Sequence, residues 1–197
     1  MSAMLLTLFL VFGQLSLMAV GGANAVVPEM LRMVVNEHGW MTAAEFTALF
    51  APNVNSYQRL CHPFASPNNA CWSHDNRAAG LRIPASSPVA RRVENRLPGA
   101  DANPYLAIAA SLAAGLHGIE NRLEPSAPIQ GEFSVPESLS LPCTLHAALE
   151  RLKHSQLAKE LFGAEFIEGY IASKTMELTS FFDEITPWER RVLAAQA

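Results

Sequence analysis

Charge is distributed very unevenly along this chain of 197 residues, and this asymmetry is the feature that most restricts its possible folds. No lysine or arginine occurs before Arg32, and no acidic residue occurs before Glu29. Residues 4–27 therefore form an uncharged, largely apolar run, and about 20 such residues suffice for a helix to cross a bilayer. We predict apolar N-terminal helices here, with membrane contact through residues 4–27 as one interpretation. A signal peptide is a second interpretation, although the start of the chain has no positive charge, and an apolar core helix is a third.

The remainder has the composition of a globular domain. Apolar residues make up 50% of the chain, which is enough to bury a sizeable core. The formal net charge of −4 gives no general attraction to nucleic acid, so any recognition of anions must be local. Cys61, Cys71 and Cys143 are odd in number and lack CxxC spacing, which argues against a disulfide framework and a zinc knuckle. We predict a reducing, cytoplasmic location, with membrane association through the N-terminus as the alternative.

Local patterns predict an α+β fold. Residues 53–98 consist of short alternating segments broken by proline, asparagine and serine, which predicts strands of one sheet. Residues 103–197 are predicted to be mainly helical and to cover that sheet. Asn103 is placed to cap a helix that begins at the following proline, and the small and apolar residues of this helix predict that it is buried. Thr186 and Glu189 have the spacing of a capping box at a last helix.

Arginines gather in one window of the chain. Six of the eleven arginines lie within fewer than forty residues that contain no lysine and only two acidic residues. They are Arg59, Arg77, Arg82, Arg91, Arg92 and Arg96. A guanidinium offers a planar fork for bidentate binding of carboxylate or phosphate, which lysine cannot supply. The cluster predicts a local anion site, and a solvated surface of ion pairs is the alternative.

One carboxylate lies inside this cluster. If residues 92–97 form a strand, Arg92, Glu94 and Arg96 project from the same face. A carboxylate between two guanidiniums stays ionised and can ligate a hard cation such as Mg²⁺. The neighbouring arginines would then hold phosphate or carboxylate oxygens.

Five ordered motifs run through the second part of the chain. They are Asn55-Ser-Tyr-Gln-Arg-Leu60, Asp75-Asn-Arg77, Leu81-Arg-Ile-Pro84, Ala90-Arg-Arg-Val-Glu-Asn-Arg96 and Ala102-Asn-Pro-Tyr-Leu106. Together they resemble the C-terminal part of the glutamine synthetases over about residues 50–197. Leu116-His-Gly-Ile-Glu120 and Thr186-Pro-Trp-Glu-Arg190 look most like the γ-glutamylpolyamine synthetase branch. The resemblance implies a partial glutamine-synthetase catalytic domain, with antiparallel strands covered by helices.

The resemblance also implies a reaction and a set of site residues. Glutamate and an amine or ammonia would be joined to a γ-glutamyl amide through γ-glutamyl phosphate, with ATP and Mg²⁺ or Mn²⁺. Arg77 and Arg96 would be catalytic, Arg59 and Arg96 would bind glutamate, Arg77 and Arg82 would bind ATP, and Glu94 would bind the metal.

Two further features of the family bear on the substrate and on assembly. Ammonia-using glutamine synthetases carry a glutamate in the loop after the first motif, where this chain has Ala65, which favours a larger amine such as a polyamine. The resemblance also implies a homo-oligomer.

Residues 1–48 depart from the glutamine synthetase pattern. They contain FGQLSLMAVGGANAVVPEM followed by VVNEHGWMTAAEF, which resembles the start of a chromate transporter family protein. We therefore expect a chimera of two parts, residues 1–48 and residues 49–197. Most of the catalytic domain, including its first metal-binding carboxylates, has no counterpart, so we expect a ligase that is truncated and inactive alone. A membrane transport protein fragment and a non-catalytic module that docks on intact synthetase subunits are the alternatives.

Overall fold

The computed structural model describes residues 44–61, 66–130, 135–194 and 196. The predicted apolar N-terminal helices lie outside the described residues, as does Ala65. Among the residues described, no helix is long and apolar enough to cross a membrane.

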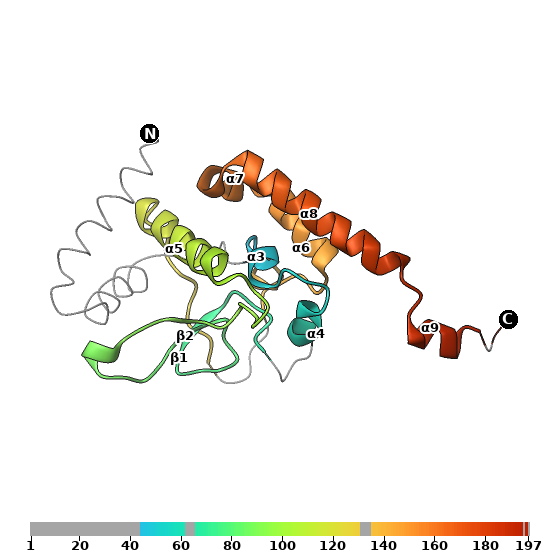
Figure 1. The fold of residues 1–197 in the computed structure, drawn as a ribbon. Helices are drawn as coiled ribbons and strands as arrows, with labels where there is room; N and C mark the ends of the chain where they lie inside the picture. The colour runs from blue at the N-terminus through green and yellow to red at the C-terminus, as the bar shows by residue number, and fades with distance from the viewer. Residues whose placement is uncertain (1–43, 62–65, 131–134, 195, 197) are drawn as a thin grey trace.

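A small three-stranded sheet lies beside the helices (Figure 1). Its strands are β1 (Trp72–His74), β2 (Leu81–Ile83) and β3 (Glu94–Asn95), in the order β1-β2-β3. The β1–β2 pair is parallel and the β2–β3 pair is antiparallel, so the expectation of antiparallel strands is wrong for one of the two pairs. A parallel pair requires the chain to return from the end of the first strand to the level of its start. Because β1 has only three residues, the short loop that begins at Asp75 is long enough to do so before β2 begins.

The prediction that residues 53–98 form strands is too broad. This region also contains the helix α4 (Ser56–Cys61) and the 3₁₀ helix η1 (Pro88–Ala90). Prolines explain part of the difference, because a proline has no N–H to donate to a neighbouring strand. The sheet therefore stays small, and loops carry most of the region.

The prediction of a mainly helical second half is confirmed. The helices are α5 (Pro104–Glu120), α6 (Leu145–His154), α7 (Gln156–Phe162), α8 (Ala164–Asp183) and α9 (Pro187–Val192), with the 3₁₀ helix η2 (Glu137–Leu139) before α6. The Asn103 side chain accepts hydrogen bonds from two amides of the first turn of α5. Thr186 and Glu189 form the predicted capping box at α9.

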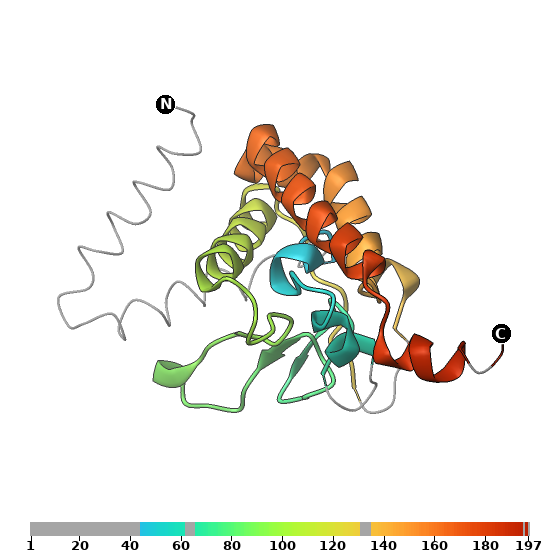
Figure 2. The same ribbon diagram turned by 45° about the vertical axis from the view of Figure 1, so that its right-hand side comes forward.

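The expectation that α5 is buried is wrong for one of its faces. Ala107, Ala110 and Ala114 are buried, whereas Tyr105 and Ile108 are 83% and 60% exposed. Small side chains therefore face the body of the protein and let the helix approach closely. In Figure 2, α5, α6 and α8 lie on the same side of the small sheet.

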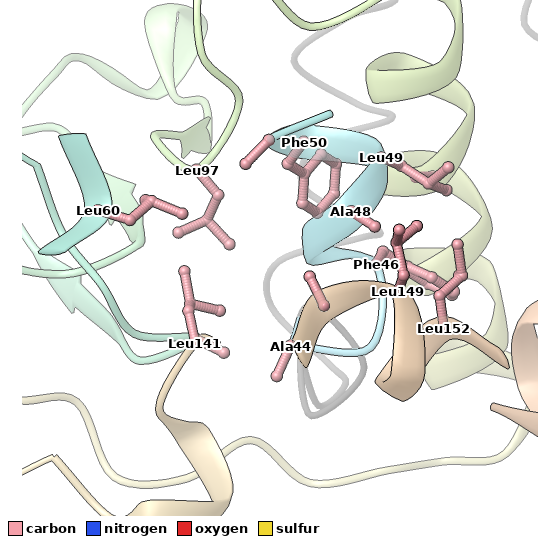
Figure 3. Close-up of a cluster of buried hydrophobic side chains, with 14 of the residues drawn as sticks. Ala44, Phe46, Ala48, Leu49, Phe50, Leu60, Leu97, Leu141, Leu149 and Leu152 are labelled. Atoms are coloured by element: carbon pink, nitrogen blue, oxygen red, sulfur yellow. The ribbon is translucent and has the colours of Figure 1, made fainter. Parts of the chain in front are cut away.

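The core joins the first described residues to the helices that follow. The short helix α3 (Thr47–Phe50) is buried, and Phe46 before it lies beside Leu149 and Leu152 of α6 (Figure 3). At the other end of the cluster, Leu60 of α4 and Leu97 after β3 gather with Leu141.

Two hydrogen bonds fasten the same first segment to the C-terminal helices. The Tyr170 hydroxyl donates to the main-chain oxygen of Ala48 at 2.7 Å, and the Ser155 hydroxyl donates to the Glu45 carboxylate at 2.5 Å. Residues 44–51 thus belong to one packed core with α6 and α8. The division of the chain at residue 48 remains a prediction.

Candidate functional site

The register of β2 and β3 places a guanidinium opposite a carboxylate. Arg82 and Glu94 are paired across the two strands, and Arg82 Nη1 donates to Glu94 Oε2 at 2.8 Å. Arg92 Nη2 donates to Glu94 Oε1 at 2.9 Å, so both oxygens of this carboxylate are bound by arginine. Arg82 also donates to Asp75, the residue with positive φ that follows β1. Pairing of β2 with β3 therefore connects Asp75, Arg82, Glu94 and Arg92 in one network of charge-assisted hydrogen bonds, to which we refer as the network.

The network keeps its carboxylates ionised. Burial raises the pKa of Glu94, but the hydrogen bonds from Arg82 and Arg92 outweigh it and hold that pKa below its usual value. The hydrogen bond from Arg82 likewise lowers the pKa of Asp75. The prediction that Glu94 stays charged between guanidiniums agrees with this geometry.

Positive charge in the cluster is not fully compensated. Arg96 Nη1 and Arg82 Nε are buried and have no hydrogen-bond partner among the described residues. Burial lowers the pKa of Arg96, and the nearby charges of Arg82 and Arg77 lower it further. A buried donor without a partner costs free energy, and an anion would satisfy it through a charge-assisted hydrogen bond. These two donors are therefore the candidate anion-binding groups of the cluster.

Arg59 holds the main chain of the site, a role that its sequence motif did not predict. Its guanidinium, on α4, donates to the main-chain oxygens of Leu97 at 2.5 Å and of Arg96 at 3.5 Å. Arg59 also donates to the Ser66 hydroxyl. These bonds hold the main chain that leaves β3 and so position Arg96. Direct binding of glutamate by Arg59 stays a prediction.

Two residues that the sequence analysis did not single out support the site. Asp101 accepts hydrogen bonds from Ser56 at 2.5 Å and from Asn53 at 3.1 Å, which anchors the start of α4. The buried side chain of Asn69 bonds to main-chain groups at the starts of β1 and β2. Asp101 directly precedes the motif that begins at Ala102, whereas Asn69 has one partner that is near in the sequence, the amide of Cys71, and two that lie 9 and 11 positions away.

The described residues fit an anion better than a metal ion. No three histidine, cysteine, aspartate or glutamate side chains converge to hold an ion in the described part of the chain. Glu94 and Asp75 are the acidic residues of the cluster, and both accept hydrogen bonds from Arg82. Glu94 could supply one ligand, so a complete Mg²⁺ or Mn²⁺ site would need ligands from beyond the described residues.

The remaining arginine of the window, Arg91, lies apart from Glu94. It lines a small cavity of about 310 Å³ at the end of β1 and β2, together with His74, Ile83 and Ser86. The cluster that the sequence predicted is therefore divided: Arg82 and Arg92 bind Glu94, the charges of Arg77 and Arg82 act on Arg96, Arg59 bonds to the main chain after β3, and Arg91 lines the cavity.

Comparisons with known proteins match two families. Residues 39–193 match the family of the glutamine synthetase catalytic domain, and residues 6–53 match the chromate transporter family. Both resemblances predicted from the motifs are thereby confirmed, and the two matches overlap over residues 39–53.

Similar proteins include gamma-glutamylethanolamide synthetase GlnA4 of Streptomyces coelicolor, with 44% identity over 147 residues, 75% of this chain and 32% of that protein. Glutamate–isopropylamine ligase of a Pseudomonas species is 41% identical over 150 residues, 75% of this chain and 33% of that protein. The solved structure of apo GmaS without ligand has a TM-score of 0.65 and 31% identity, and the match covers 87% of this chain and 38% of that one. This chain spans about a third of the length of the curated relatives that it matches.

Proposed function

Because the chain belongs to the glutamine synthetase family, we propose that it carries the arginine-rich part of a site that joins glutamate to an amine. The observation that carries the proposal is that two buried donors, Arg96 Nη1 and Arg82 Nε, have no hydrogen-bond partner among the described residues and lie in the same cluster as an ionised Glu94. Such donors are suited to anionic oxygens that change charge during a phosphoryl transfer.

The proposed steps are phosphorylation of the glutamate γ-carboxylate by ATP and displacement of the phosphate by the amine. Arg96 would bind the carboxylate of glutamate and its phosphorylated form, and Arg59 would assist by fixing the main chain beside Arg96. Arg77 and Arg82 would hold phosphate oxygens of ATP. Neutralising charge at those oxygens is the contribution that guanidiniums make in phosphoryl transfer.

Glu94 is our proposed metal-facing carboxylate. When bound, Mg²⁺ or Mn²⁺ would neutralise phosphate charge. Because both oxygens of Glu94 accept from arginine, the described residues alone do not fit a complete ion site. We therefore propose that binding and turnover separate in this chain, so that it binds ATP or glutamate but does not form amides alone at the rates of longer relatives.

The amine is proposed to be larger than ammonia, such as a polyamine or another small primary amine. The names of two relatives support this, because one is an ethanolamide synthetase and the other an isopropylamine ligase.

The test measures binding and turnover with the same purified chain. Glutamate and ATP with Mg²⁺ are titrated by calorimetry, and amide formation is followed with putrescine and with ammonia. Arg96→Ala should weaken glutamate binding at least about 10-fold, the value of a lost hydrogen bond to a charged group. Arg190→Ala is the matched control, because it removes an exposed arginine of α9 outside the cluster.

Three outcomes would change the proposal. Equal loss of binding in the Arg96 and Arg190 variants would assign the effect to net charge and remove the site. ATP binding unchanged in Arg77→Ala would show that Arg77 holds no phosphate. Amide formation at the rates of longer relatives would overturn the separation of binding from turnover.

We also propose that the chain is cytoplasmic and self-associates. Large apolar side chains are exposed at the end of α8, between the two helices and on α9, where Phe182, Ile185 and Trp188 are 72%, 63% and 57% exposed. The same surface favours the alternative of a module that docks on intact synthetase subunits. Sedimentation of the chain alone and mixed with a full-length relative separates the two, because a docking module associates only in the mixture.

We propose a division into residues 1–48 and 49–197, which the match of the two parts of the chain to two different families supports. The membrane-transport alternative depends on residues 6–53, most of which lie outside the described residues.

A further inference from the structure

Two cysteines that are far apart in the sequence meet at the surface. Cys61 is the last residue of α4, and Cys143 lies just before Thr144, the N-cap of α6. They are 82 positions apart, yet Cys61 Sγ donates a hydrogen bond to the main-chain oxygen of Cys143 at 3.1 Å. Both residues are exposed and unbridged, whereas Cys71 is buried.

The two residues also line one cavity of about 420 Å³, whose walls include Tyr57, Leu145 and Phe181. Burial raises the pKa of the Cys61 thiol, and the side chain of Cys143 raises it further through a hydrogen bond and through charge. The Cys61 thiol therefore lies against Cys143 at a surface that small thiol reagents can reach. Neither has a role in the proposed ligase site.

We propose that Cys61 and Cys143 are a redox-active pair that forms a reversible disulfide with a small disulfide such as oxidised glutathione. One thiolate attacks a sulfur of oxidised glutathione, which forms a mixed disulfide and releases one glutathione thiolate. The second protein thiolate attacks the protein sulfur of the mixed disulfide and releases the second glutathione. The two protons lost by the protein thiols are taken up by the two glutathione thiolates, so the protein is oxidised by two electrons and one glutathione disulfide is reduced.

The disulfide would connect α4, which supports the anion site, to the start of α6, which belongs to the helical core. α4 holds Arg59, which positions the main chain beside Arg96, and α6 packs against α3 and α8 in the core. A bond from α4 to the start of α6 therefore fastens the support of the anion site to the helical core. It also closes a long loop in the unfolded chain, and its formation should raise the melting temperature by on the order of 10 °C.

The test uses the full chain, first reduced and then incubated in glutathione buffers of increasing oxidised fraction. Non-reducing peptide mapping should find a peptide that links Cys61 to Cys143 and has lost two hydrogen atoms, and the melting temperature should rise as it forms. Because the pKa of Cys61 is raised, bridge formation should accelerate with pH through the alkaline range. Cys61→Ser and Cys143→Ser should each abolish the linked peptide, whereas Cys71→Ala should retain it.

A second measurement needs no variant. Phenylarsine oxide, a trivalent arsenical that bridges two neighbouring thiolates, should bind one per chain and protect Cys61 and Cys143 together from alkylation. Glutathione attached separately at both cysteines without a bridge, or a bridge that involves Cys71, would overturn the proposal. Independent alkylation of the two thiols in the presence of the arsenical would overturn it as well.

Discussion

Removing the side chain of Asn69 tests how the sheet beneath the arginines is held. Asn69 is 2% exposed, and its Oδ1 accepts hydrogen bonds from the amides of Cys71 at 3.1 Å and Gly80 at 3.2 Å. Its Nδ2 donates to the main-chain oxygen of Ala78 at 3.0 Å. One side chain thus joins the residues that lead into β1 to those that lead into β2, where Arg82 lies.

The expected cost of Asn69→Ala follows from the groups that it leaves unpaired. The amides of Cys71 and Gly80 belong to buried residues, and each buried donor without a partner costs about 1–3 kcal/mol. Ala78 is exposed, so its oxygen can bond to water instead. We therefore expect a loss of about 2–6 kcal/mol in the free energy of unfolding, or a decrease of roughly 5–20 °C in the melting temperature.

Urea unfolding and calorimetry of the two proteins measure this loss, with Asn68→Ala as the control. Asn68 is the same residue type one position earlier, but its side chain is exposed, so its substitution should change stability by less than about 0.5 kcal/mol. Hydrogen exchange at the amides of Cys71 and Gly80 should accelerate only in the Asn69 variant. A loss below about 1 kcal/mol with unchanged exchange at both amides would refute the argument.

Three further predictions test the site and the caps. In Gly80→Ala the new Cβ would lie 2.0 Å from the main-chain oxygen of Asn69, so urea unfolding should show a loss of about 2 kcal/mol or more in the free energy of unfolding. Gly169→Ala on α8 is the control, because its new Cβ has no atom within 4 Å and should not lower the free energy of unfolding. Burial raises the pKa of Glu94, but its two guanidinium partners outweigh burial and hold that pKa below its usual value. The ionised Glu94 therefore stabilises the folded state above about pH 4.3, and this stabilisation is lost as the pH falls through the lower pKa of the folded state. The stability gap between the wild type and Glu94→Gln should therefore narrow below about pH 4 in thermal melts, and a constant gap would contradict the ion pairing. Thr186→Ala removes the capping box, so amide exchange in α9 should accelerate while the global melting temperature stays unchanged, because α9 buries no residue.

Features that depend on neighbours within one turn of helix were available from the sequence. Asn103 caps α5 and Thr186 caps α9 as predicted, because a cap bonds to amides only two or three residues further on. Family membership could also be predicted from the sequence, since each of the ordered motifs is a local pattern of residues. The predicted helical region 103–197 contains α6 and α8, and the buried residues of α6, among them Leu145, Leu149 and Leu152, recur at helical spacing.

The candidate site was only partly predictable. The spacing of Arg92 and Glu94 predicted that they share a face, and the structure joins them at 2.9 Å. The partner on the other side of Glu94 is Arg82 rather than Arg96, because the register of β2 against β3 decides which residue lies opposite. Register is set by which faces of both strands are buried and by the geometry of the connection between them, so the spacing within residues 92–96 alone does not specify it.

Contacts between distant segments were decided by the tertiary structure alone. Arg59 bonds to the main-chain oxygen of Leu97, 38 positions away, and so supports the main chain next to Arg96. Asn69 joins two strands through main-chain groups, and Cys61 meets Cys143 across 82 positions. Such contacts form only after burial of the core has brought the segments together, and burial depends on the summed apolar surface of many residues. Residue types and caps were therefore determined locally, whereas the partners of each charged and polar side chain were determined by packing.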